Sequence, residues 1–123
     1  MSFSFFASPK QRLYAKGRLK SGEMNRTEKA YAGYLEAEKQ AGRVAGFWFE
    51  SIKLKVADGA CFYTPDFLVL LADGTVELHE VKGSPRIFLD DAKVKCKCVA
   101  TQYPFPLKVV YPRKGGGWDV QEV

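Results

Sequence analysis

Residues 63–83 read YTPDFLVLLADGTVELHEVKG and decide the fold of the surrounding chain. Apolar, strand-forming residues lie on both sides of Asp73-Gly74, a dipeptide typical of hairpin turns. A loop of about three residues centred on Asp73 predicts that Asp66 lies directly across from Glu80. Opposed residues on antiparallel strands have Cβ atoms about 5 Å apart. The hairpin is therefore expected to bring these two carboxylates together.

The face of the hairpin that carries Asp66 and Glu80 has an unusual composition for a structural sheet. Side chains alternate along a strand, so Lys82 is expected on the same face. The rest of that face is apolar and consists of Leu68, Leu70, Val76 and Leu78. Two carboxylates there would repel each other and lose hydration. A hard divalent cation such as Mg²⁺ removes both problems, because it binds carboxylate oxygens and keeps several waters.

Neighbouring groups fit the same interpretation. The backbone carbonyl of Val81 could supply a further oxygen ligand. Lys82 could orient or deprotonate a metal-bound water, or stabilise the negative charge that builds on a phosphate. Pro65 withholds a strand donor and would distort the strand just before Asp66. The pattern therefore predicts a metal site with an ammonium group beside it. The structural alternative is an ion-paired cluster at the end of the sheet.

Outward from this hairpin, the sequence predicts a single α/β domain with a mixed sheet. Asn25 and Glu28 form a capping-box pair that starts a helix, and Gly42 is placed to end it. A second helix is expected from Asp90-Asp91 to about Thr101. The expected strands lie within 47–56, at 61–71 with an interruption before Asp66, at 75–82, at 107–111 and at 118–123, with a hairpin turn at 57–60. The order is helix, three-strand meander, helix and strand, which is an α/β sandwich.

Pro65-Asp66, thirteen intervening residues and then Glu80-Val81-Lys82 resemble the signature of the PD-(D/E)XK nuclease superfamily. The helix that carries Glu28 resembles the usual first motif of that superfamily. The expected αβββαβ order from Asn25 to Tyr111 is similar to its restriction-endonuclease-like core, a mixed central sheet flanked by helices. The fuller strings at 63–67 and 79–83 are most similar to small phage-type endonucleases and Holliday-junction resolvases.

The resemblance implies a metal-dependent endonuclease that hydrolyses DNA phosphodiester bonds with Mg²⁺ or Mn²⁺ and leaves a 5′-phosphate. Asp66 and Glu80 would be metal ligands, Lys82 the water-positioning or acid–base residue, and Glu28 a ligand or a water-mediated partner of the metal. Glu28 has a second interpretation, because a capping-box glutamate points to the start of its own helix. The resemblance to resolvases implies that the substrate could be junction or branched DNA. One site cuts one strand, so a resolvase would have to be a homodimer.

Basic residues gather towards both ends of the chain, whose net charge is +5. Residues 1–29 hold seven basic and two acidic residues, and residues 93–118 hold six basic residues and no acid. We expect a basic N-terminal arm over 1–23, with a short helix around 10–16, and a single nuclease domain over 24–123. Sequence-independent DNA phosphate contacts are expected from both basic regions, namely from Arg12, Lys16, Arg18, Lys93, Lys95 and Lys97.

Several other residues have structural interpretations. Lys95 shares a helical face with Ala92, Cys96 and Val99, so it either approaches the scissile phosphate or is solvated. His79 has the opposite parity to Glu80 and is expected to face away from the acids. The three cysteines show no CxxC spacing, which argues against a zinc site or a disulfide framework.

Two further features bear on location and on alternative functions. No apolar run approaches the roughly 18–20 residues that span a bilayer, and the opening residues lack the features of a signal peptide. We therefore expect a cytoplasmic protein with no membrane partner, in a bacterial host cell if it is encoded by a phage. The alternatives are a non-catalytic DNA-binding module on the same fold and a regulator of other proteins, for which an apolar patch around Phe3–Phe6 would be the clue.

Overall fold

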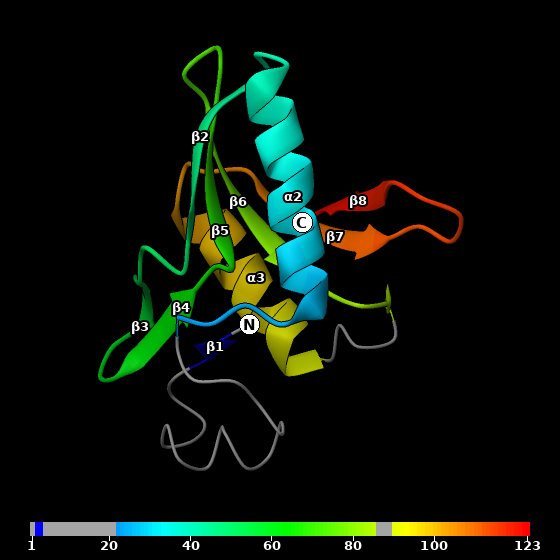
Figure 1. Ribbon diagram of the computed structural model, residues 1–123. Helices are drawn as coiled ribbons and strands as arrows, with labels where there is room; N and C mark the ends of the chain where they lie inside the picture. Colours follow the sequence, from blue (N-terminus) through cyan, green and yellow to red (C-terminus); the bar gives the residue numbers. More distant parts are fainter. Residues whose placement is uncertain (1, 4–21, 86–89) are drawn as a thin grey trace.

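The structure is a computed structural model that describes residues 2–3, 22–85 and 90–123 (Figure 1). The elements of these residues follow in the order β1 (Ser2–Phe3), α2 (Arg26–Gln40), β2 (Val44–Phe49), β3 (Leu54–Ala57), β4 (Cys61–Thr64), β5 (Phe67–Leu71), β6 (Val76–Val81), α3 (Asp90–Gln102), β7 (Leu107–Pro112) and β8 (Trp118–Glu122). Most of the predicted arm lies outside the described residues. So do the helix expected around 10–16 and the DNA contacts expected from Arg12, Lys16 and Arg18.

Five strands form a mixed sheet in the order β2-β5-β6-β7-β8. Neighbouring strands run antiparallel except β6 and β7, which are parallel. Parallel neighbours need a long crossover connection, and α3 lies in the chain between these two strands. The predicted α/β class with a mixed sheet is therefore confirmed. Neither of the two described helices is long and apolar enough to cross a membrane.

Each face of the central sheet is covered by one helix. On one face, Tyr31 and Leu35 of α2 belong to a buried cluster with residues of β2, β5, β6 and β7, namely Val44, Phe67, Val69, Val81 and Val110. On the other face, α3 contributes Ala92, Cys96 and Val99 to a cluster with Tyr63, Leu78, Leu107, Val109 and Tyr111. Because side chains alternate along β6, the Glu80 side chain lies on the α3 face.

A second sheet of three short strands has the order β1-β4-β3. The turn at 57–60 joins β3 to β4, as predicted. The predicted simple meander is wrong in one respect, because the runs 47–56 and 61–71 each divide between the two sheets. Glu50, just after β2, has a positive φ of 48°, and Pro65, between β4 and β5, has no N–H for a ladder. The β3–β4 hairpin is thus inserted into a meander made by β2, β5 and β6.

The predicted ends of the two helices agree closely with the structure. Asn25 is the N-cap of α2, its side chain accepts the N–H of Glu28 at 2.8 Å, and Glu28 Oε1 accepts the N–H of Asn25 at 2.9 Å. Gly42, with φ of 82°, follows the C-cap residue, a left-handed position that favours glycine. Helix α3 runs from Asp90 to Gln102, one residue beyond the predicted end.

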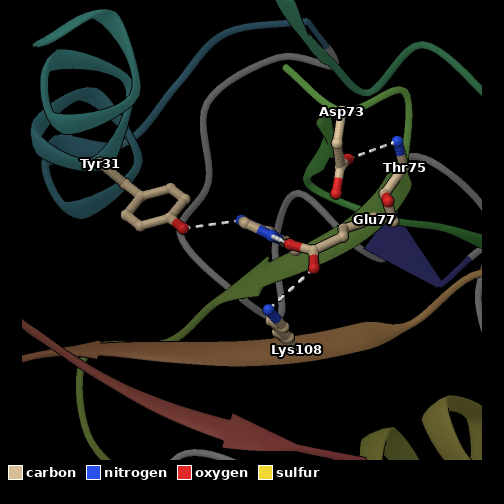
Figure 2. Close-up of polar contacts among 6 residues, drawn as sticks. Tyr31, Asp73, Thr75, Glu77 and Lys108 are labelled. Carbon is tan, nitrogen blue, oxygen red and sulfur yellow. Dashed lines mark hydrogen bonds and ion pairs between the residues drawn. The ribbon is translucent and has the colours of Figure 1, made fainter. Parts of the chain in front are cut away.

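The turn between β5 and β6 sets the register of the hairpin. Asp73 Oδ1 accepts the N–H of Thr75 at 2.9 Å (Figure 2), and Gly74 takes a φ of 92°. The Leu71 N–H donates to the Thr75 carbonyl at 2.8 Å, which closes a three-residue loop centred on Asp73. This local chemistry fixes which residues of β5 and β6 lie opposite each other.

A buried polar network on the α2 face joins α2, β6 and β7 (Figure 2). The Tyr31 hydroxyl lies 2.7 Å from His79 Nδ1, and His79 Nε2 lies 2.9 Å from Glu77 Oε1. The second oxygen of Glu77 pairs with Lys108 Nζ at 2.8 Å. Hydrogen bonds from His79 and Lys108 lower the pKa of Glu77 to about 2. Since the Glu77 carboxylate can only accept, His79 Nε2 is the donor of the hydrogen bond to Glu77.

Candidate active site

The carboxylates of Asp66 and Glu80 lie opposite each other at the end of the β5–β6 ladder. The last paired residues are Phe67 and His79, and the same register places Asp66 across from Glu80, as the loop length predicted. Both side chains are fully buried, with 0% of their surface exposed. His79 points to the other face of the sheet, towards Tyr31, so the prediction from its parity is confirmed.

Pro65 shapes the backbone around Asp66. In the register of the hairpin Pro65 lies opposite Val81, and a proline has no N–H to donate to the Val81 carbonyl. The Val81 N–H donates instead to Asp66 Oδ2 at 2.8 Å. On the other side, the Asp66 carbonyl accepts the N–H of Glu50 at 2.9 Å. The Asp66 carboxylate is thus held against the backbone of β6, one residue from Glu80.

The two oxygens of Glu80 have different surroundings. Oε1 accepts the hydroxyl of Tyr63, a fully buried residue of β4, at 2.5 Å. Oε2 is buried, accepts no hydrogen bond from any described residue, and lies 3.5 Å from Lys82 Nζ. Lys82 is itself 8% exposed and shares the face of Glu80. The predicted grouping of two carboxylates and one ammonium is therefore present.

Burial governs the protonation of Glu80 and Tyr63. Loss of water and the nearby charge of Asp66 raise the pKa of Glu80 to about 8, although Lys82 opposes the shift. Burial, followed by the charge of Glu80, also raises the pKa of Tyr63 well above its ordinary value. Tyr63 therefore remains a hydrogen-bond donor at neutral pH, and the ionised form of Glu80 requires additional positive charge close by.

Sequence reasoning did not assign Tyr63 to the site. Alternation along a strand could not place Tyr63 beside Asp66, three residues later, because Pro65 interrupts the strand between them. Tyr63 lies in β4, which belongs to the three-stranded sheet. A usable signal was its chemistry: a tyrosine inside a buried cluster needs a partner for its hydroxyl. That partner is Glu80, and the Cys96 thiol lies 3.9 Å from the same hydroxyl.

The predicted lysines of α3 have different environments. Lys93 and Lys97 are exposed, as expected for residues that could meet a DNA backbone. Lys95 is only 2% exposed, on the helical face of Ala92, Cys96 and Val99. Its Nζ lies 3.4 Å from the Phe62 carbonyl of β4. The interpretation of Lys95 as a solvated lysine is therefore wrong, because the β3–β4 hairpin covers this part of α3.

Glu28 is 2% exposed and fills the capping role described above. Among residues 2–3, 22–85 and 90–123, no three or more His, Cys, Asp or Glu side chains form a group that could hold a metal ion. Glu28 therefore does not join Asp66 and Glu80 in such a group, and its role as a ligand stays a prediction. Cys61, Cys96 and Cys98 are free thiols, and Cys96 is part of the core.

Comparisons with known proteins return no match: no family model, no curated protein and no solved structure is similar to this chain.

Proposed function

We propose that the chain is a metal-dependent DNA endonuclease whose active site contains Asp66, Glu80 and Lys82. One observation carries the proposal: two fully buried carboxylates oppose each other beside an ammonium group. Such a pair is costly for a structural sheet, since like charges repel and buried charges lose hydration. A buried carboxylate with a raised pKa, such as that of Glu80, is more typical of functional sites.

The donor set fits a hard divalent cation. Asp66 and Glu80 supply carboxylate oxygens, which Mg²⁺ and Mn²⁺ prefer. Glu80 Oε2 in particular is buried with no hydrogen-bond donor among the described residues. The Val81 carbonyl faces Pro65, which cannot donate to it, so this oxygen is a further ligand candidate. Asp66 and Glu80 are the two carboxylates that the described residues bring together, so water and phosphate oxygens would complete the coordination, as is usual for Mg²⁺.

Each residue then has a role in phosphodiester hydrolysis. When bound, Mg²⁺ or Mn²⁺ lowers the pKa of a water and neutralises charge on the phosphate. Asp66 and Glu80 would hold this ion. Lys82, 3.5 Å from Glu80 Oε2, positions the attacking water or stabilises the charge that develops on the phosphate. The product would carry a 5′-phosphate, as the resemblance to PD-(D/E)XK nucleases implies.

The same resemblance supports a restriction-endonuclease-like core. Without β1, the inserted β3–β4 hairpin and β8, the described elements follow the order α2, β2, β5, β6, α3, β7, which corresponds to the αβββαβ order of that core. The net charge of +5 and the exposed Lys93 and Lys97 favour a DNA substrate held through its phosphates. Cleavage of a junction would require a homodimer with two such sites.

The test compares cleavage of supercoiled plasmid, linear duplex and four-way junction with Mg²⁺ or Mn²⁺. We expect D66N to abolish cleavage and K82A to slow it by about 10²- to 10⁴-fold, the usual contribution of an acid–base residue. Glu77→Gln is the matched control, because Glu77 is also a buried carboxylate of β6 but lies on the opposite face. Cleavage that survives both site substitutions would reject the assignment. Binding without cleavage by the unaltered protein would favour the non-catalytic module.

A further inference from the structure

The hydroxyl of Tyr63 reaches the site from a different sheet. Tyr63 lies in β4, whereas Glu80 lies in β6, Lys82 directly follows that strand and Asp66 directly precedes β5. It donates to Glu80 Oε1 at 2.5 Å. No described residue donates a hydrogen bond to Glu80 Oε2, which lies 3.5 Å from Lys82 Nζ. The two oxygens of one carboxylate are thus distinguished by a single tyrosine.

Tyr63 has little freedom to move. Strand β4 is paired on both edges, so that Tyr63 lies opposite Phe3 of β1 and opposite Leu54 of β3. Its ring is fully buried in the core cluster under α3. The neighbouring Phe62 carbonyl lies 3.4 Å from Lys95 Nζ. A hydroxyl held in this way fixes the orientation of the carboxylate that it contacts.

We infer that Tyr63 is a positioning residue that reserves Glu80 Oε1 and leaves Oε2 as the oxygen that binds the divalent cation. The inference rests on the proposed function, since it assigns an atom within that site. It also gives a role to the buried hydroxyl of Tyr63, which comes from a hairpin outside the central sheet. Outer-shell partners of metal ligands typically contribute about 10- to 100-fold to metal affinity.

The test is Mn²⁺ binding without DNA, measured by electron paramagnetic resonance or calorimetry at one fixed pH. We expect Tyr63→Phe to weaken Mn²⁺ binding by about 10- to 100-fold relative to the unaltered protein. Tyr31→Phe is the matched control. It removes another buried tyrosine hydroxyl, which lies 2.7 Å from His79 on the opposite face of the sheet, and it should leave Mn²⁺ affinity unchanged.

The outcomes separate the inference from the proposed function. Equal Mn²⁺ affinity of Tyr63→Phe and the unaltered protein would overturn the role of Tyr63 while the metal site stands. An equal loss in Tyr31→Phe would also overturn it, because the effect would then be a general loosening. No Mn²⁺ binding by the unaltered protein would overturn both.

A second measurement covers the case in which Tyr63→Phe does not fold. Infrared difference spectra of the unaltered protein with and without Mg²⁺ report how a carboxylate binds, and Glu80→Gln identifies the band of Glu80. A wide splitting of the carboxylate stretches, the signature of binding through one oxygen, would support the inference. A narrow splitting, the signature of binding through both oxygens, would overturn it.

Discussion

Replacement of Glu80 by glutamine tests the burial of its charge through the pH dependence of stability. The pKa of Glu80 rises from its ordinary value of 4.5 to about 8 because of burial and the charge of Asp66. Between these pH values the folded protein keeps a proton that the unfolded chain has released. The free energy of unfolding therefore falls as the pH rises, by about 1.4 kcal/mol per pH unit. The full effect, reached above pH 8, is of the order of 5 kcal/mol.

The assay is urea unfolding of the unaltered protein and of E80Q from pH 5 to pH 9, first in EDTA and then with Mg²⁺. Glutamine does not titrate, so the difference between the two proteins isolates Glu80 from all other groups. In EDTA, E80Q should gain stability relative to the unaltered protein as the pH rises. Mg²⁺ should reduce that difference by stabilising the ionised carboxylate of the unaltered protein.

Parallel stability curves of the two proteins in EDTA would refute the reasoning, because Glu80 would then titrate alike in the folded and unfolded chains. Stability curves that diverge in EDTA but do not respond to Mg²⁺ would support the buried titration of Glu80 and contradict the proposed metal site.

Three further substitutions test the framework that holds the site, each by urea unfolding at pH 7. Asn25→Ala removes the cap of α2 and should cost about 1 kcal/mol, whereas DNA cleavage should persist; lost cleavage would assign the helix start a role in catalysis. Gly74→Ala forces a side chain into φ of 92° and should cost about 1–2 kcal/mol, and an unchanged stability would contradict this turn. Leu78→Ala leaves a cavity under α3, where Leu78 is fully buried, and should cost about 2–5 kcal/mol; a loss below 1 kcal/mol would argue against this core.

The candidate site could be predicted where it depends on local chemistry. The Asp73-Gly74 turn sets the hairpin register within a few residues, and strict alternation then assigns faces to Glu80 and His79. The capping box of Asn25 and Glu28 is equally local. These features depend on neighbours in the sequence, so the chain alone specifies them.

The remaining features depend on contacts between distant segments. The strand that Pro65 interrupts joins two different sheets, and only the pairing of β4 with β1 and β3 shows this. Tyr63 reaches Glu80 through that pairing, and Lys95 is buried because the same hairpin covers α3. Side-chain alternation and strand propensity carry no information on such packing. The sequence alone therefore did not assign Tyr63 to the site and could not decide between the two interpretations of Lys95.

The parallel pairing of β6 with β7 has a consequence for the order of folding. Strands β5 and β6, which bring Asp66 and Glu80 together, are joined by a three-residue loop. Strand β7 can pair with β6 only after the whole crossover that includes α3 has been arranged. The entropy of loop closure favours the contact that is nearer in sequence. We therefore expect the β5–β6 hairpin to form first and α3, with Lys95, to pack later. In stopped-flow experiments Gly74→Ala should then slow refolding, whereas Val109→Ala in β7 should mainly accelerate unfolding. Slower refolding of Val109→Ala alone would reverse the proposed order.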